Sequence, residues 1–463
     1  MKHLLIILLA ASAAALAGCG GDSSPQAGTD ELVIYSAHSE EIISEFTAGF
    51  RAWYKARTGR DVAVSWPDPG GGGTQMLKRL EDKFRAHRFD VDICFGGGPL
   101  YNRMDQLGML APCPLPEAVR QALPLKAAGQ PLVDPDGHWY GSAISTFGII
   151  YNKTLLRDKG LPEIKDWESL ADPKLAGFVG LGDPGKSSTA LKTIEIILQA
   201  YGYERGMSIA VRTGANAREF YAAAYDVPRN TAKGFIAAGP CIDFYAYRQM
   251  HSEGGERLGL AVPPGLTVIT PDPIGVLKNA PHPAVAAAFV EFVVSPAGQR
   301  LWMLPVGAPG GPTKHALQRL SLLPAVVDEA AALGVAVPFN PFTAPPADFY
   351  SPEKETSRQA VLADYLRVAM VENHAGLKRA WQAIIAAGLP PERVALLVRP
   401  LVTEDEMIRL GRDVWAPVLV PDDAPADEKA KLTREQEVRQ RRKSDLLTAW
   451  SEAFRTRYEA LAK

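Results

Sequence analysis

The sequence predicts an α/β protein built around parallel sheet and divided into two or three lobes. Two observations predict this fold class. Short apolar segments alternate with helical patterns along most of the chain, and strand–loop–helix units of this kind require a parallel sheet. The chain also has 463 residues, more than one domain of about 100–200 residues. After residue 345 long helical patterns replace the alternation.

The first units lie between residues 32 and 95. We expect strands at 32–35, 62–66 and 91–95, where apolar residues run together and end at Ser, Pro or Gly. A helix is predicted over 40–58, because apolar residues recur every three or four positions, and a second over 74–84 with Thr74 as its cap. Ligands of open α/β sheets bind at the carboxyl ends of such strands.

The alternation of predicted strands and helices continues through the middle of the chain. Strands are predicted over 139–151 and 178–181, followed by a helix over 190–201. A further strand over 234–247 is expected to end in Asp243, Tyr245 and Tyr247, and residues 283–294 form a strongly periodic helix.

The last third is predicted to be helical, notably over 357–373 and 428–462, with a linker over 421–427. In the final helix Leu446, Trp450, Phe454 and Tyr458 recur every fourth residue. Such a stripe is more often a face docked on the same chain than a partner site.

The N-terminus has the pattern of an export signal. Lys2 precedes an apolar stretch over residues 4–16, which is too short to span a bilayer but fits a signal peptide. The stretch ends in Leu16-Ala17-Gly18-Cys19, which resembles a bacterial lipobox. We therefore expect a signal peptide over 1–18, a lipid on Cys19, a tether over 19–31, and a periplasmic or cell-surface lipoprotein.

Charge and cysteine content argue against nucleic-acid binding and against a zinc-ribbon site. With 50 Lys and Arg against 52 Asp and Glu, nothing indicates nucleic acid. Besides Cys19, the chain has Cys94, Cys113 and Cys241 and no CxxC motif, so a zinc ribbon is unsupported. Cys94 and Cys113 could pair in an oxidising compartment, although Cys94 lies in an apolar run and fits a small buried hydrophobe better.

Residues 180–187 match the phosphate-loop pattern G-x-x-x-x-G-K-[ST], with Lys186 and Ser187 at its end. The loop follows a strand and opens a helix, so it favours an anion whether or not a nucleotide binds. No good magnesium-binding acid follows a second strand, and the export signal places the chain where ATP is scarce. We interpret the match as an anion-facing helix start.

Other candidate residues follow the first strands. Glycine-rich loops over 70–74 and 96–98 are typical of tight turns and also of close backbone approach to a ligand. His38, Asp243, Tyr245 and Tyr247 could form a metal shell or only hydrogen bonds. There is no H-E-x-x-H or G-x-S-x-G motif and no paired-carboxylate site, so catalysis has weak support and no cofactor is predicted.

Several segments, in the order in which they occur along the chain, resemble the extracellular solute-binding proteins of bacterial ABC importers. The resemblance is to the branch that includes ferric-iron, 2-aminoethylphosphonate, thiamine and polyamine binders. It covers residues 32–312 and rests on residues 32–38, 71–74, 136–141, 151–153, 167–174, Asp183-Pro184, Ser187-Ser188, 279–283, 289–292 and 295–299.

The resemblance implies two lobes of the periplasmic-binding-protein type II fold, joined by hinge strands, that close on a ligand and dock on a membrane permease. Lobe one would comprise 32–142 and 264–344, and lobe two 143–263. Residues 345–463 would be an added C-terminal helical extension, longer than the family requires.

The resemblance also implies which residues face the cleft. In ferric binders adjacent tyrosines bind iron, whereas Tyr245 and Tyr247 here would point apart on an extended segment. To the implied residues we add Lys186 and Asp243 from their own patterns. The predicted ligand-binding residues are Ser36, His38, Gly72, Gly73, Thr74, Gly97, Gly98, Ser145, Lys186, Ser187, Ser188, Thr189, Asp243 and Tyr245.

The leading hypothesis is a lipid-anchored solute-binding protein that is not an enzyme, captures a small anionic solute and delivers it to a permease. One alternative is an exported metal-assisted hydrolase that uses His38, Asp243 and Tyr245 in the same cleft. Another is an envelope interaction protein that acts through the C-terminal helices.

Overall fold

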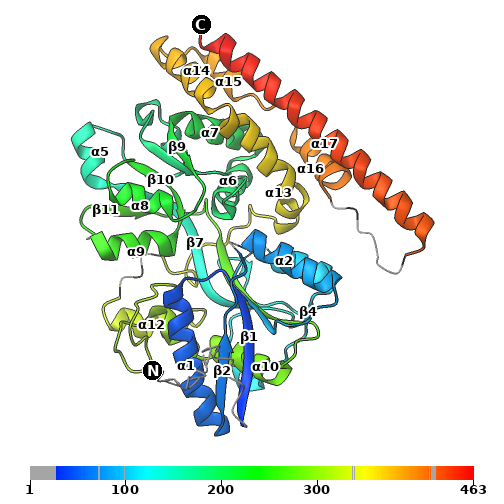
Figure 1. The fold of residues 1–463 in the computed structure, drawn as a ribbon. Helices are drawn as coiled ribbons and strands as arrows, with labels where there is room; N and C mark the ends of the chain where they lie inside the picture. Colours follow the sequence, from blue (N-terminus) through cyan, green and yellow to red (C-terminus); the bar gives the residue numbers. More distant parts are fainter. Residues whose placement is uncertain are drawn as a thin grey trace, which may run out of the picture.

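The computed structural model describes residues 28–463 except 71–72, 99, 254, 336, 338, 417 and 419–423. Two α/β lobes lie one above the other, and a helical extension packs on the upper lobe (Figure 1). The predicted signal peptide, Cys19 and most of the tether lie outside the described residues.

The lobes share one ten-stranded sheet. Eight of its strands follow the order β2 (Asp61–Ser65), β1 (Thr29–Ser36), β3 (Ile93–Phe95), β12, β7, β10, β8 (Val179–Gly182) and β9 (Ala217–Tyr221). The other two are β4 (Leu110–Ala111), which pairs with β12, and β11, which pairs with β7. Two long strands pass between the lobes: β7 (Tyr140–Asn152) and β12 (Ile269–Leu277). The first half of β7 pairs with β12, and its second half pairs with β10 (Ala238–Ile242) and β11 (Leu258–Ala261). The fold is therefore the predicted two-lobed binding-protein type with hinge strands.

Lobe one packs helices on both sides of a parallel β2-β1-β3 core. Its centre is a cluster of aromatic side chains that includes Phe46, Phe95, Phe289 and Trp302. The elements of lobe one are β1 (Thr29–Ser36), α1 (Glu40–Thr58), β2 (Asp61–Ser65), α2 (Gly73–Arg85), β3 (Ile93–Phe95), α3 (Leu100–Gln106), β4 (Leu110–Ala111), α4 (Glu117–Ala122), β5 (Lys126–Ala127), β6 (Gln130–Pro131), α10 (Pro283–Val294), α11 (Pro296–Met303) and α12 (Pro324–Ala332).

Lobe two surrounds the other end of the sheet and has its own core, which includes Trp167, Leu175 and Ile196. Besides β10 and β11, its elements are α5 (Lys153–Lys159), β8 (Val179–Gly182), α6 (Ser188–Tyr201), α7 (Tyr203–Asn216), β9 (Ala217–Tyr221), α8 (Asp226–Ala232) and α9 (Asp243–Glu253). The predicted domain boundaries at 142/143 and 263/264 stay a prediction.

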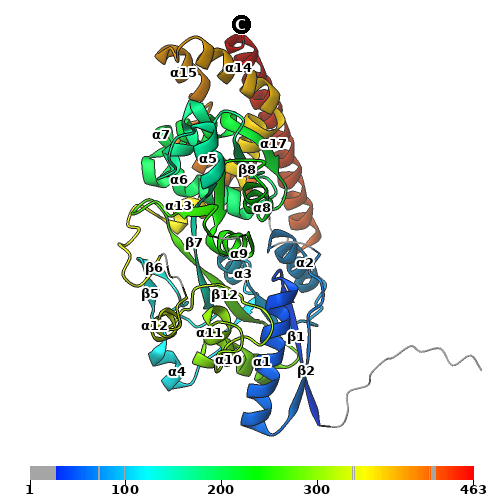
Figure 2. The ribbon, with the colours of Figure 1, turned by 90° about the vertical axis from the view of Figure 1, so that its left-hand side faces the viewer.

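The extension covers one flank of lobe two, as the two views agree (Figures 1 and 2). It consists of α13 (Pro352–Leu366), α14 (His374–Ala386), α15 (Pro391–Val398), α16 (Glu404–Leu410) and the long α17 (Ala426–Leu461). Trp450, Phe454 and Tyr458 of α17 are buried in a core shared with α6 and α7. The predicted docked face of this helix is thus confirmed.

Two sequence-based expectations are wrong in detail. The predicted strand over 234–247 ends at Ile242, and Asp243, Tyr245 and Tyr247 lie on helix α9. Thr74 is not a cap, because α2 already begins at Gly73. Cys94, Cys113 and Cys241 are all free and buried, which confirms the interpretation of Cys94 as a small core residue and leaves the alternative of a Cys94–Cys113 pair without support.

Candidate functional site

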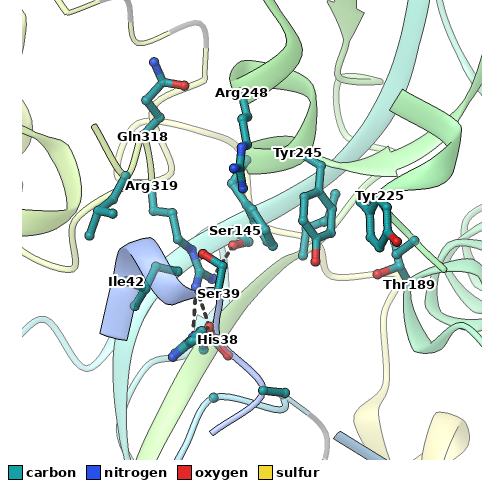
Figure 3. A pocket seen from close by; sticks show the side chains of 18 of the residues that line it. His38, Ser39, Ile42, Ser145, Thr189, Tyr225, Tyr245, Arg248, Gln318 and Arg319 are labelled. Carbon is teal, nitrogen blue, oxygen red and sulfur yellow. Dashed lines mark hydrogen bonds and ion pairs between the residues drawn. The ribbon is translucent and has the colours of Figure 1, made fainter. Parts of the chain in front are cut away.

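A cleft of about 820 Å³ lies where the two lobes face each other. Its walls come from the starts of α1, α2, α6 and α9, the loop after β3, the hinge strands and a segment that follows α11. Figure 3 shows that side chains from both lobes converge on it. The polar and charged residues in its lining are His38, Ser39, Glu41, Ser145, Lys186, Ser187, Ser188, Thr189, Lys192, Tyr225, Tyr245, Arg248, His251, Ser252, Thr270, Asp272, Lys314, His315, Gln318 and Arg319.

The lobe-two wall is the start of α6. Ser187 is its N-cap, and the Ser187 side chain accepts a hydrogen bond from the Ala190 N–H. The N–H groups of Ser188 and Thr189 are the first two of the helix and have no intrahelical acceptor. Because they lie in the cleft lining at the positive end of the helix dipole, they favour an anion there.

The loop that matches the phosphate-loop pattern is closed on itself. The N–H groups of Gly185, Lys186 and Ser187 all donate to Asp183. They are therefore used within the loop rather than presented to a phosphate chain. Lys186 is 65% exposed, and its ammonium lies 3.6 Å from the Asp183 carboxylate, so this side chain reaches solvent at the cleft.

The lobe-one wall follows β1 and β3. The backbone N–H of His38 donates to the Ser36 hydroxyl, which holds the turn after β1. After β3, Gly97 has φ of +102°, and a Cβ there would lie 2.8 Å from the Leu100 side chain and 2.9 Å from that of Met76. The positive φ favours glycine here, and an added Cβ would also require the Leu100 and Met76 side chains to shift.

A buried charge network joins the hinge to the segment after α11. Arg319 donates to the Asp272 carboxylate at 2.5 Å and to the Ser145 hydroxyl at 3.0 Å. His38 Nε2 lies 2.8 Å from the same carboxylate and 3.3 Å from Arg319 (Figure 3). Asp272 also accepts from the Gly97 N–H at 3.2 Å.

The surroundings of Asp272 and Arg319 keep this pair charged. Burial raises the pKa of the Asp272 carboxyl, but Arg319 and His38 outweigh it and hold that pKa well below its usual value. The Arg319 side chain is only 3% exposed, and its guanidinium lies 4.5 Å from the Phe244 ring centre and 5.0 Å from that of Trp302. Arg319 is thus a fixed cation in the cleft floor.

An ion pair also bridges the lobes at the cleft. Arg248 on α9 of lobe two donates to Glu41 on α1 of lobe one at 2.6 Å. A hydrogen bond from Ser39 and the charge of Arg248 lower the pKa of Glu41, so the pair stays ionised. The structure therefore has the lobes in contact across the cleft.

The structure places most predicted site residues in the lining. Ser36 is buried behind His38, and Asp243 is also outside the lining. Gly72, the Thr74 side chain and Cys19 lie outside the part that the structure describes. The predicted residues in the lining are His38, Gly73, Gly97, Gly98, Ser145, Lys186, Ser187, Ser188, Thr189 and Tyr245.

The four candidate metal ligands are not brought together. Asp243 is buried and accepts from the Phe244 N–H at 2.8 Å, and burial raises its pKa to about 7. The Tyr247 hydroxyl is buried with no hydrogen-bond partner among the described residues, whereas Tyr245 lines the cleft. On a helix two residues apart differ by about 200° in direction, so the two tyrosines still point apart.

Six charged residues of the lining were not among those predicted from the sequence: Glu41, Lys192, Arg248, Asp272, Lys314 and Arg319. Asp272 lies between two prolines within a strand, and Arg319 lies beside an apolar run, both unusual places for a charge. These two signals could have marked them as buried charges. No local signal identifies Glu41, Arg248 or Lys314, whose place depends on how the lobes meet.

Comparisons with known proteins agree with this geometry. Residues 91–320 match the family model described as bacterial extracellular solute-binding protein. The phosphoglycerate transport regulatory protein PgtC of Salmonella typhimurium is 29% identical over 159 residues, which cover 34% of this chain and 39% of that protein. Less than half of the length of this relative is therefore matched.

Solved structures show the same fold. Apo ferric ion-binding protein A of Pasteurella haemolytica superposes with a TM-score of 0.57 at 15% identity, covering 73% of this chain and 98% of that one. Iron-bound HitA from Pseudomonas aeruginosa has a TM-score of 0.53 at 18% identity, covering 73% and 99%. Among the described residues, every helix is too short or too polar to traverse a bilayer.

Proposed function

Because residues 91–320 belong to the bacterial extracellular solute-binding proteins, we propose that this chain captures a small anionic solute between its lobes and delivers it to an ABC permease. The family is one of exported binding proteins. The anionic ligand, the permease and a lipid anchor at Cys19 are our proposals, as is the absence of catalysis.

The charge of the cleft lining carries the proposal for an anion. Two carboxylates, Glu41 and Asp272, face five cationic side chains across the described lining. Four of the five form ion pairs, but the Lys186 ammonium lies 3.6 Å from its partner Asp183 and the Lys186 side chain is 65% exposed. Lys314 lies on the exposed segment after α11. The cations of the lining are Lys186, Lys192, Arg248, Lys314 and Arg319.

The start of α6 supports the same ligand class. Ser188 and Thr189 present N–H groups at the positive helix end, and Lys186 precedes them. Converging N–H groups and ammonium groups recognise phosphate, phosphonate or carboxylate oxygens. The relative named for phosphoglycerate transport is consistent with a ligand of this class.

Binding would act by shifting the balance between open and closed lobes. A ligand that touches α6 on lobe two and the His38 turn on lobe one binds only the closed form fully, and so stabilises it. Glu41 and Arg248 already join the lobes beside the cleft, so closure adds the ligand to an existing bridge.

A thermal-unfolding screen tests the ligand class. We would use the exported chain from residue 19 with Cys19→Ser, together with 3-phosphoglycerate, hexose phosphates, 2-aminoethylphosphonate, phosphate, sulfate, ferric citrate, spermidine, thiamine and Mg-ATP. A ligand at about 100 times its Kd adds about 2.7 kcal/mol to the free energy of unfolding, which raises Tm by several degrees. We expect a shift with one of the non-nucleotide anions, recovered unchanged after incubation. Shifts with spermidine or thiamine alone, or turnover of the ligand, would contradict the proposal.

A further inference from the structure

The C-terminal extension contacts the ligand-facing helix α6 along its length. Helix α13 lies beside α6 (Figure 1). Arg367, which follows α13, lies against Gly185, where an added Cβ would be 3.1 Å from the Arg367 side chain. The extension therefore reaches the loop that opens the cleft wall.

A buried ion pair fixes α13 against α6. Arg358 donates to Glu195 at 2.7 Å, with the side chains 0% and 1% exposed. Arg358 also donates to Glu404 of α16 at 2.5 Å. Charges buried this completely are costly to separate, so α13 and α6 form one rigid unit.

One turn earlier on α6, Lys192 belongs to both the cleft and the extension. It is in the cleft lining, yet its ammonium donates to the Glu355 carboxylate of α13 at 2.7 Å and to the Tyr350 hydroxyl at 2.6 Å. The Tyr350 hydroxyl donates to the same Glu355 oxygen at 2.5 Å. The side chains of Lys192 and Glu355 are 12% and 7% exposed.

We propose that the extension sets the charge of the binding cleft, because Glu355 neutralises Lys192 at its wall and so limits the affinity for highly charged anions. This inference rests on the proposed function. A compensated ion pair has a much weaker field at a distance than a single charge, and in a partly buried site that difference is not screened away. Glu355 is thus a specificity-determining residue that acts through Lys192.

Three variants separate this role from a structural one, with 3-phosphoglycerate as the highly charged probe and glycerate as the singly charged one. Glu355→Gln adds one net positive charge, Lys192→Gln removes one, and the double variant restores the balance. We expect the affinity for 3-phosphoglycerate to rise severalfold in Glu355→Gln, to fall in Lys192→Gln and to return near the wild-type value in the double variant. Glycerate should follow the same order with smaller changes, because it carries less charge.

For Glu355→Gln, thermal stability and anion affinity should change in opposite directions. Glu355→Gln should lower Tm, since it weakens a buried ion pair, while it raises anion affinity. Asp61→Asn is the matched control, because Asp61 forms an exposed pair with Lys55 on lobe one and changes the net charge equally. The control should leave anion affinity unchanged. If Glu355→Gln and Lys192→Gln both weaken binding alike, the extension is only a scaffold and the inference is wrong.

A second readout needs no ligand. Acetic anhydride acetylates free amines, and mass spectrometry gives the rate at Lys192. We expect Glu355→Gln to accelerate acetylation of Lys192 relative to Lys159 at the exposed end of α5, and an unchanged rate would overturn the inference. If the wild-type protein binds no anion, the proposed function is wrong. The acetylation rate of Lys192 still shows whether the ion pair with Glu355 protects its ammonium group. If Glu355→Gln does not fold, Lys192→Gln alone must weaken 3-phosphoglycerate more than glycerate.

Discussion

Arg319 shows how a single residue links the hinge to the cleft. It is buried between two aromatic rings, and its charge is balanced by Asp272 on β12. Without Arg319 the Asp272 carboxylate would lie in the same place with only His38 and backbone groups beside it. The residue therefore supports the fold and the charge of the cleft together.

Replacing Arg319 by Gln should lower the free energy of unfolding by about 3 kcal/mol, because it removes the buried partner of Asp272. The loss should not be larger, since the Asp272 carboxylate is 15% exposed and keeps His38 at 2.8 Å. Urea unfolding would measure the loss. Adding Asp272→Asn to the same chain should recover part of it, since the orphaned carboxylate is then removed. A single variant as stable as wild type would show that the pair is not buried as described.

The buried carboxyl group of Asp243 should make folding stability depend on pH. Burial raises its pKa from 3.8 to about 7, so the folded state holds a proton that the unfolded state releases between these values. Folding stability should therefore fall as pH rises from about 4 to about 7, with a slope of up to about 1.4 kcal/mol per pH unit.

The test is a comparison of urea unfolding at several pH values. Asp243→Asn keeps the side-chain oxygen that accepts from the Phe244 N–H, yet it cannot titrate. Relative to this variant, wild type should lose stability across the window and be flat above it. Parallel profiles for the two proteins would mean that Asp243 is already ionised.

At the scale of elements, helix α17 depends on one buried face. Phe454 is 2% exposed, whereas Val438 on the same helix is 67% exposed. Phe454→Ala should destabilise the protein by about 3–5 kcal/mol, whereas Val438→Ala should have little effect. Thermal unfolding would compare them, and equal effects would indicate that the helix is not held by this face.

The sequence predicts elements well where apolar periodicity is strong. The helices expected over 40–58 and 283–294 have these bounds in α1 and α10, because each buries one clear face. The strand expected to reach Tyr247 ends earlier, since the aromatic residues there also suit the first turns of α9. Local patterns cannot distinguish these two outcomes, and packing of α9 against β7 and β10 decides between them.

The candidate site could be predicted only where it follows strand ends. The His38 turn, the loop with Gly97 and Gly98, and the start of α6 are continuous with predicted strands and helices. Asp272 and Arg319 meet only because β12 and the segment after α11 return to the same place in lobe one. A contact between residues so far apart in sequence has no local signature.

At the scale of the whole molecule, the Glu41–Arg248 pair should influence lobe closure. Glu41→Gln removes the cross-lobe charge, so it should shift the unliganded protein toward an open arrangement with a larger radius of gyration. Small-angle scattering would detect the shift. Lys55→Gln, which weakens an exposed ion pair within lobe one, is the control and should leave the radius unchanged.

If Glu41→Gln has the radius of wild type, this ion pair does not hold the lobes together. The ion pair should contribute only a modest free energy to lobe closure, because both side chains are partly exposed and solvent screens their charges. A small shift in a two-state balance still changes ligand affinity, since affinity scales with the population of the competent state.

We propose above that the cleft binds an anion through its cationic lining. Calorimetric titration of 3-phosphoglycerate, or of the anion found by the thermal screen, into wild type and Lys186→Ala/Lys314→Ala tests it directly. We predict one site per chain in wild type and an affinity at least about tenfold weaker in the variant, equivalent to about 1.4 kcal/mol, while Lys159→Ala binds as wild type does. Equal binding by wild type and the double variant, or heat only with a cationic or neutral solute, would contradict the claim.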